Sequence, residues 1–480
     1  MTKTPTARDP AVVDRLSRRL RVQVAGKPQR GIAVPAPGFA AEALQELGRI
    51  QLRSDDVEQR TRVALALERG RVHLEGIRFS DLCRLTMATR LACDVLWVLL
   101  SARARGYSAF QRQLAEVPLD LAFPEGAAIR IKPISTASVA FHERRLGELV
   151  ELEIRRRGYR PAESGDEEPF PLSVEIFENR LTVAASLAGE PLYRRGYRAE
   201  LRATAPLRED IAAGVVERTM SFARVRRPDY FPRTVINPFA GSGTLALEAA
   251  AAVLDIPPCV FARRFACEQL SGAQGKGVRF ARRRLLEDAA ERLAPAASVH
   301  LIALDIDGDA LSAFENSARL FSRALRDRIA PGVEVKVVTR AADCLRESWV
   351  AAGDSGGGDG DALILANPPY GRRLHCGSDL AELFQRVGRA AMLEVERWRG
   401  YRDGTIAGAI LCPNESSWRA ARGAFDASDM AITTSHFTHG GLDMRLLCFA
   451  SARRQGHWPP PQVQEDTVGT ERDSLGRLCS

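Results

Sequence analysis

Residues 234–244 constrain the fold of this chain more than any other stretch. They read Thr-Val-Ile-Asn-Pro-Phe-Ala-Gly-Ser-Gly-Thr. The β-branched apolar run at 234–236 is typical of a strand that is buried on both faces of a sheet. Pro238 ends that strand, because proline has no N–H group to give to the ladder of hydrogen bonds. The stretch therefore predicts a central strand followed at once by a change of direction.

A tight turn and a helix follow this strand. Gly241 and Gly243 permit backbone conformations that a Cβ atom would forbid, and they let a ligand approach the main chain. The alanine-rich run that begins at Thr244 favours a helix, whose first N–H groups would face that ligand. This arrangement predicts a nucleotide-like cofactor at the carboxyl end of a parallel strand. ATP or GTP hydrolysis is excluded, since the turn lacks both the Gly-x-Gly-x-x-Gly pattern and the lysine of a phosphate-binding loop.

A second buried strand ends in an equally specific segment. Residues 362–371 read Ala-Leu-Ile-Leu-Ala-Asn-Pro-Pro-Tyr-Gly. The glycine turn and this Asn-Pro-Pro-Tyr segment, in this order, resemble the S-adenosylmethionine-dependent methyltransferases that modify exocyclic amino groups of bases. The resemblance implies S-adenosylmethionine (SAM) as the cofactor.

The four residues of the Asn-Pro-Pro-Tyr segment suit that chemistry. The side chain of Asn367 and the carbonyl of Pro368 are acceptors, which can bind the two N–H groups of an amine and orient its lone pair toward the methyl group. Pro369 helps to fix the direction of that carbonyl. Tyr370 can stack on a base that is flipped out or unpaired. No strong base is needed, since the proton can leave after the transfer.

Two aspartates complete the predicted cofactor site. Asp305 ends a predicted strand at 298–304, where a carboxylate can accept both ribose hydroxyls. A helix N-cap is the alternative role, for which Asp307 is the better candidate. Asp343 follows another strand and is placed to accept from the adenine amino group. The predicted cofactor-binding residues are Asn237, Pro238, Gly241, Gly243, Thr244, Asp305, Asp343 and Asn367.

Strand and helix patterns divide the chain into four parts. Residues 31–190 mix strands and helices in an α+β order, whereas residues 191–451 alternate strand and helix and end in a hairpin. That alternation predicts an α/β fold, a doubly wound Rossmann-like parallel sheet with one antiparallel edge strand. Residues 1–30 hold eight basic and two acidic side chains and predict a disordered basic tail, with a short helix around 12–22. Residues 452–480 predict a second disordered tail.

The order of elements resembles the bacterial large-subunit ribosomal RNA guanine-N2 methyltransferases, whose N-terminal half contains a THUMP domain. The matches are Arg71-Val-His-Leu-Glu-Gly76, a helix with Arg84 and Arg90, and Leu192-Tyr-Arg-Arg-Gly-Tyr-Arg198. The resemblance covers roughly residues 30–450. It implies a ferredoxin-like/THUMP region that grips structured RNA, and a catalytic domain that forms N2-methylguanine in 23S rRNA or a large-subunit precursor.

The last of these matches supplies the predicted RNA-binding residues Arg194, Arg195 and Arg198. The alternative for these three arginines is a surface strand end that bonds to acidic neighbours. The family usually has aspartate at the position of Asn237 and often cysteine at Ala240. The amide of Asn237 keeps an acceptor and removes a charge. The sequence indicates no role for the glycine-rich segment at residues 272–277.

Composition limits the location and the partners. The net charge of +8 favours a polyanionic partner. The nine cysteines form no Cys-x-x-Cys pair, which indicates reduced thiols and no metal site. The sequence has neither an apolar signal-peptide core nor a run long enough to span a bilayer, so we expect a cytoplasmic protein without a membrane partner.

These observations predict a SAM-dependent RNA methyltransferase that forms N2-methylguanine. One alternative is an adenine-N6 methyltransferase acting on RNA or DNA, since the same four residues can bind either amine. The other alternative is a non-catalytic RNA-binding assembly factor with a decayed cofactor site.

Overall fold

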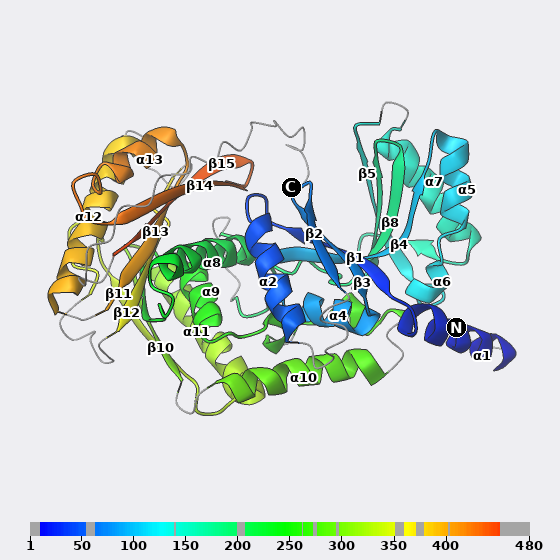
Figure 1. The fold of residues 1–480 in the computed structure, drawn as a ribbon, viewed down its shortest axis with the longest axis horizontal. Coiled ribbons are helices and arrows are strands. Elements are labelled where there is room, and N and C mark those ends of the chain that lie inside the picture. Colours follow the sequence, from blue (N-terminus) through cyan, green and yellow to red (C-terminus); the bar gives the residue numbers. More distant parts are fainter. Residues whose placement is uncertain are drawn as a thin grey trace.

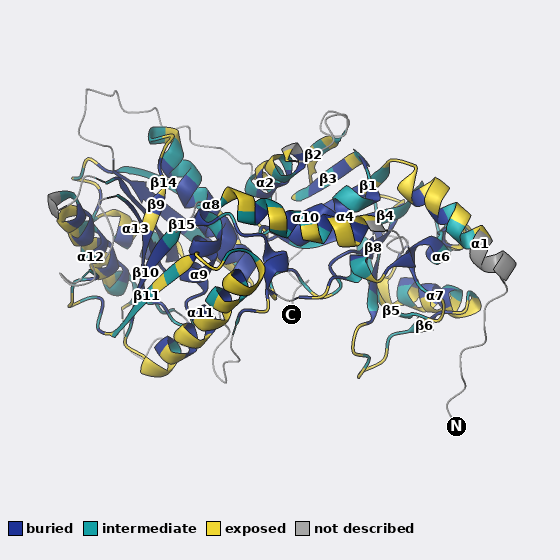
Figure 2. Ribbon diagram, turned by 90° about the horizontal axis from the view of Figure 1, so that it is seen from below, coloured by how far each residue is buried: buried dark blue, intermediate teal, exposed yellow. Residues whose placement is uncertain are grey.

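The computed structural model describes residues 10–53, 63–138, 141–198, 207–261, 263–271, 276–293, 297–350, 360–370, 379–401 and 404–451. Two sheets, each with its own helices, lie next to each other along the longest axis of the molecule (Figure 1). Strands of both sheets are largely buried, whereas α11 and α12 turn one exposed face outward (Figure 2). No helix within the described residues is long and apolar enough to cross a membrane. In the same residues no group of three His, Cys, Asp or Glu side chains could hold a metal ion.

The first sheet has eight strands in the order β2-β3-β1-β4-β8-β7-β5-β6. Neighbouring strands are antiparallel, except that β5 runs parallel to both β6 and β7. The mixed α+β character predicted for this region is confirmed. The strands are β1 (Gln29–Pro35), β2 (Ala64–Glu68), β3 (Arg71–Ile77), β4 (Ala92–Arg103), β5 (Ala128–Thr136), β6 (Arg160–Pro161), β7 (Phe170–Phe177) and β8 (Arg180–Ser186). The helices are α1 (Pro10–Arg19), a π-helical turn (Leu20–Ala25), α2 (Ala40–Leu52), α4 (Phe79–Ala88), α5 (Tyr107–Ala115), α6 (Leu119–Ala122) and α7 (Glu143–Arg156).

The short helix predicted around 12–22 is confirmed, whereas the disorder predicted for the rest of residues 1–30 is wrong for residues 10–30. Residues 10–25 are helical, and β1 begins at Gln29. Leu20 and Val24 are buried in the core of the first sheet, and Arg19 pairs with Asp120 on α6. Leu16 also packs against this core, so the segment has an apolar side that is buried, although its composition is that of a solvated tail. Residues 1–9 and 452–480, for which disorder was also predicted, lie outside the described residues.

The second sheet has seven strands in the order β11-β10-β9-β12-β13-β15-β14. Helices α8, α9 and α11 lie on one side of it, and α12 and α13 on the other (Figure 1). Its strands are β9 (Pro232–Pro238), β10 (Ser298–Asp305), β11 (Glu334–Ala341), β12 (Asp361–Ala366), β13 (Ile406–Cys412), β14 (Ala431–His439) and β15 (Leu442–Ala450). Its helices are α8 (Glu209–Arg226), α9 (Thr244–Val253), α10 (Lys276–Arg292), α11 (Gly308–Arg328), α12 (Leu380–Tyr401) and α13 (Glu415–Arg422), with short 3-10 turns at Pro258–Val260 and Ala266–Glu268.

The doubly wound sheet is confirmed, but the antiparallel strand does not lie at its edge. β15 runs antiparallel to both β13 and β14 and lies between them. The second strand of the terminal hairpin pairs with the parallel strands, so its first strand, β14, is left outside. The change of strand order falls between β9 and β12, because the chain passes from β9 to β10 and β11 before it returns to pair with β9 on its other side. Such a point is where open α/β sheets bind ligands.

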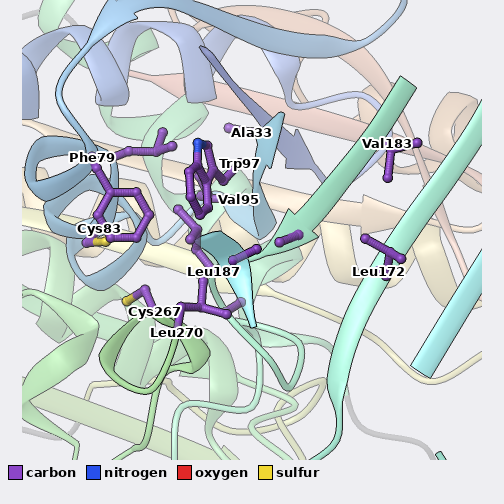
Figure 3. Packing of buried hydrophobic residues seen from close by; sticks show 14 of the residues in the cluster. Ala33, Phe79, Cys83, Val95, Trp97, Leu172, Val183, Leu187, Cys267 and Leu270 are labelled. Carbon is purple, nitrogen blue, oxygen red and sulfur yellow. The ribbon is translucent and has the colours of Figure 1, made fainter. Parts of the chain in front are cut away.

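Residues beyond β8 also complete the core of the first sheet. Cys267 and Leu270, which follow α9 in the chain, pack beside Phe79 and Cys83 of α4 (Figure 3). Val278 on α10 belongs to the same buried cluster. The predicted boundary at residue 190 therefore separates the strands of the two sheets. It does not separate their cores, because residues beyond 190 belong to the core of the first sheet.

Candidate active site

The turn between β9 and α9 has positive φ at every second residue. Phe239, Gly241 and Gly243 have φ values of +57°, +53° and +76°. A Cβ atom on Gly243 would lie 1.8 Å from a ring carbon of Phe314 on α11, whereas one on Gly241 would meet nothing within 4 Å. Glycine at 243 is therefore required by packing, and Gly241 leaves open space over its own backbone.

Asp305, at the end of β10, holds this turn in place. Its Oδ2 accepts the N–H of Gly241 at 2.7 Å, and its Oδ1 accepts the N–H of Asp307 at 3.0 Å. Asp307 caps α11, as predicted, by accepting the N–H groups of Asp309 and Ala310. Each carboxylate oxygen of Asp305 has a second lone pair, so the predicted contact with ribose hydroxyls stays open as a prediction.

Two asparagines at the ends of neighbouring strands carry buried acceptors without a partner among the described residues. Asn237 is 1% exposed, and its Nδ2 donates to the carbonyl of Leu365 on β12 at 2.7 Å. Its Oδ1 and the Oδ1 of Asn367 have no hydrogen-bond partner there. A buried acceptor left unpaired costs about 1–3 kcal/mol, so native proteins rarely keep one without a purpose. The pair indicates a place where a ligand supplies donors.

The rest of the Asn-Pro-Pro-Tyr segment follows directly after β12. Pro368 is buried, and Pro369 and Tyr370 are half-buried. Tyr370 packs against the buried cluster that contains α8, α9 and α11 side chains. The segment therefore lies at the carboxyl end of β12, next to the end of β9 that carries the glycine turn.

Asp343 lies beyond β11, two strands away from β9. Its Oδ1 accepts the N–H of Leu345 at 2.9 Å, and its Oδ2 is 3.2 Å from Nε of Arg346. The next residue, Cys344, is buried in the cluster against which Phe239 packs. This packing brings the Asp343 loop to the glycine turn, while the role of Asp343 toward adenine stays a prediction.

The structure corrects the role predicted for Arg195. Its side chain is 1% exposed and bonds to the carboxylate of Glu248 on α9 at 3.3 Å and to the carbonyls of Leu192 and Arg90. Tyr197 donates to the same carboxylate at 2.7 Å. A guanidinium that is enclosed in this way cannot reach a phosphate of RNA, so the prediction for Arg195 is wrong. The available signal was Glu248 itself, a single charge in an otherwise apolar helix.

Arg198 and Arg194 differ from Arg195 and from each other. Nη2 of Arg198 lies 3.0 Å from the carbonyl of Leu207, 3.1 Å from Oγ1 of Thr244 and 3.0 Å from the carboxylate of Glu209. It therefore lies at the first residue of α9, beside the predicted cofactor site. Arg194 is exposed and pairs with Glu190 at 2.8 Å. Its predicted contact with RNA stays a prediction.

Ile306 is a residue of this region that the sequence reasoning missed. It is 80% exposed and lies between Asp305 and Asp307 at the carboxyl end of β10. An apolar side chain exposed between two aspartates offers a surface for the flat part of a ligand. The sequence signal was the apolar residue in an Asp-Ile-Asp segment directly after a strand.

Replacing Glu209 with glutamine is expected to stabilise the protein more at pH 8 than at pH 5. Burial at the start of α8 raises the pKa of Glu209 from 4.5 to about 7, although Arg198 and Arg195 oppose the shift. The folded protein thus holds a proton that the unfolded chain releases above its own pKa, and that stability is lost as the pH rises through about 7. Glutamine removes the titration and keeps an acceptor for Arg198. The difference in free energy of unfolding between variant and wild type should grow by about 2–3 kcal/mol over this range.

Urea unfolding at both pH values measures this difference. Glu287→Gln, on the exposed face of α10, serves as the control and should give the same difference at each pH. An equal effect of Glu209→Gln at pH 5 and pH 8 would contradict the raised pKa.

The part of the chain that carries this site is similar to known proteins. Residues 195–401 match the family described as RMKL-like, methyltransferase domain. Two curated relatives are the ribosomal RNA large subunit methyltransferases K/L of Magnetococcus marinus and Marinobacter nauticus. The first is 26% identical over 405 residues, which are 82% of this chain and 51% of that protein. The second is 26% identical over 327 residues, which are 66% of this chain and 41% of that protein. The chain thus spans about half the length of these relatives, or less.

Solved structures share the fold. SMU.472, crystallised in complex with S-adenosylhomocysteine (SAH), has a TM-score of 0.62 at 18% identity, over 90% of this chain and all of its own. TrmN from Thermus thermophilus has a TM-score of 0.56 at 18% identity, over 88% of this chain and 99% of its own. Residues 195–401, which match the RMKL-like methyltransferase domain family, contain both the glycine turn and the Asn-Pro-Pro-Tyr segment.

Proposed function

We propose that this protein is a SAM-dependent RNA methyltransferase that forms N2-methylguanine in large-subunit (23S) ribosomal RNA. The observation that carries the proposal is the Oδ1 of Asn367, which is buried at the end of β12, beside the glycine turn of β9, and has no hydrogen-bond partner among the described residues. The two ribosomal RNA methyltransferases similar to this chain support ribosomal RNA as the substrate. The net charge of +8 suits such a polyanion.

The residues present fit the cofactor. Gly241 leaves room above its backbone, and Asp305 lies one strand away with lone pairs available. Asn237 has a buried acceptor that finds no donor within the residues that the structure describes. Asp305 would accept the ribose hydroxyls, and Asp343 the adenine amino group. When bound, SAM supplies a methyl group on a positively charged sulfur, which an amine can displace.

The chain's own contribution is to orient the acceptor amine. Oδ1 of Asn367 and the carbonyl of Pro368 each accept one N–H of the exocyclic amino group. The nitrogen lone pair then points away from both oxygens, along the line of displacement. Tyr370 stacks on the base. The amine needs no deprotonation beforehand, because its proton leaves to water after the new bond forms.

A comparison of modified nucleosides tests the proposal. Ribosomal RNA from a strain that lacks this protein is digested to nucleosides and compared with the parent by mass spectrometry. The same RNA is then treated with purified protein and labelled SAM, with Asn367→Ala as the inactive control. Loss of N2-methylguanine that only the wild-type protein restores is the expected result. Loss of N6-methyladenine would identify the adenine-N6 alternative, and no change in any methylated nucleoside would favour a binding factor.

A further inference from the structure

The guanidinium of Arg198 is held at one nitrogen. Within the described residues, all its polar contacts pass through Nη2, which faces Leu207, Thr244 and Glu209. The side chain is 25% exposed. Arg198 is therefore fixed in position by the protein while other N–H groups remain available to a ligand.

The surroundings of Arg198 favour an anion. Thr244 begins α9, so the helix presents its first N–H groups and the positive end of its dipole here. Asn237, 1% exposed at the end of the strand that leads to this helix, has an Oδ1 to which no residue in the described part of the chain donates. A ligand at this helix end would thus meet a guanidinium, backbone donors and an acceptor.

The charge of Arg198 is only partly compensated by its neighbours. Glu209 is the carboxylate nearest to it, and burial raises the pKa of Glu209 to about 7, so near neutral pH this group is partly protonated. The other charges that act on Glu209 are Arg195 and Glu248, which pair with each other at 3.3 Å. The arrangement therefore leaves positive charge beside α9 for an incoming anion.

We infer that Arg198 binds the α-carboxylate of the amino-acid part of the cofactor. The inference rests on the proposed function, since it takes SAM and SAH as the ligands. A carboxylate is the natural partner of a guanidinium, and charge-assisted hydrogen bonds are about twice as strong as neutral ones. The role differs from the one predicted from sequence, in which Arg198 contacts RNA. A phosphate of RNA is the rival anion that the test below separates.

The test compares two ligands on two proteins by calorimetry. The ligands are SAH and S-adenosyl-3-thiopropylamine, which is SAH without its α-carboxyl group. The wild-type protein should bind SAH about 10- to 100-fold more tightly, the range expected for a hydrogen bond to a charged group. Arg198→Met should bind both ligands with nearly equal affinity. Arg194→Met, an exposed arginine four residues earlier in the same segment, should keep the wild-type ratio.

Every other result of this calorimetry would contradict the assignment of Arg198 to the α-carboxylate. If Arg198→Met weakens both ligands by the same factor, Arg198 supports the turn only through Thr244 and Leu207. A wild-type protein that binds the two ligands equally would overturn the assignment without any variant, so a misfolded variant does not block the test. If the ratio is unchanged in Arg198→Met but RNA binding becomes weaker and less salt-dependent, the anion is a phosphate. If the wild-type protein binds neither ligand, the proposed cofactor fails, and this inference fails with it.

Discussion

Replacing Asn367 with alanine should lower the turnover number for methyl transfer by at least about 100-fold. The amine would lose one of two acceptors that align its lone pair, and misplacement of a reacting group by about 1 Å has an effect of this size. Binding of SAH should persist, because the glycine turn, Asp305 and Asn237 are untouched. The variant also removes a buried acceptor that none of the described residues pairs with, so its free energy of unfolding should not fall.

Single-turnover assays with labelled SAM measure the chemical step, and calorimetry with SAH measures binding. Asn316→Ala, on the exposed face of α11, is the matched control and should leave both quantities unchanged. Normal turnover by Asn367→Ala would remove Asn367 from the mechanism. Loss of SAH binding together with turnover would make Asn367 a cofactor ligand rather than a group that orients the amine.

Replacing Gly243 with alanine should destabilise the protein by about 2–5 kcal/mol. The residue has φ of +76°, which costs an alanine roughly 1–2 kcal/mol. The new Cβ would also lie 1.8 Å from the ring of Phe314, which is fully buried. Overpacking of this kind adds about 1–3 kcal/mol. Either the ring or the turn must move, so SAH binding should be lost as well.

Gly241→Ala is the matched comparison within the same turn. Its φ of +53° gives a similar backbone cost, but the new Cβ meets no atom within 4 Å. Urea unfolding should therefore show a loss of only about 1–2 kcal/mol, while calorimetry should show weaker SAH binding. A second change, Phe314→Ala, should recover part of the stability of Gly243→Ala by making room for the methyl group. Equal losses at the two glycines, without recovery, would exclude the contact with Phe314 as the cause.

The parts of the site that could be predicted from sequence are those formed by one contiguous segment. The strand, turn and helix at 232–253 and the segment at 367–370 are where the sequence places them, because turn chemistry and apolar runs are local properties. Arg195 could not be placed in this way. Its partner Glu248 lies 53 residues away, and only the tertiary packing brings the two together. The order of β14 and β15 was open to prediction, because β15 holds a continuous apolar run over 446–450 that is typical of a central strand, whereas residues 433–436 of β14 are polar.

Residues 10–30 show where prediction from composition fails. Composition alone made residues 10–30 look like a solvated arm, yet Leu20 and Val24 are buried and hold the arm against the first sheet. Burial of these side chains orders the segment despite its large excess of basic residues. The stabilisation comes from the particular apolar side chains that are buried and not from the average composition of the segment.

The downstream residues in the first core have a consequence for synthesis of the chain. Cys259, Phe265, Cys267 and Leu285 belong to the same buried cluster as the strands that end at Ser186. A ribosome that has just finished β8 must add roughly 100 more residues, on the order of 5–20 s of translation, before that cluster has all its members. Until then α4 lacks its cover from α10. We therefore expect the core of the first sheet to remain incompletely packed while the rest of the chain is translated. The two halves of the chain should then reach their native packing together.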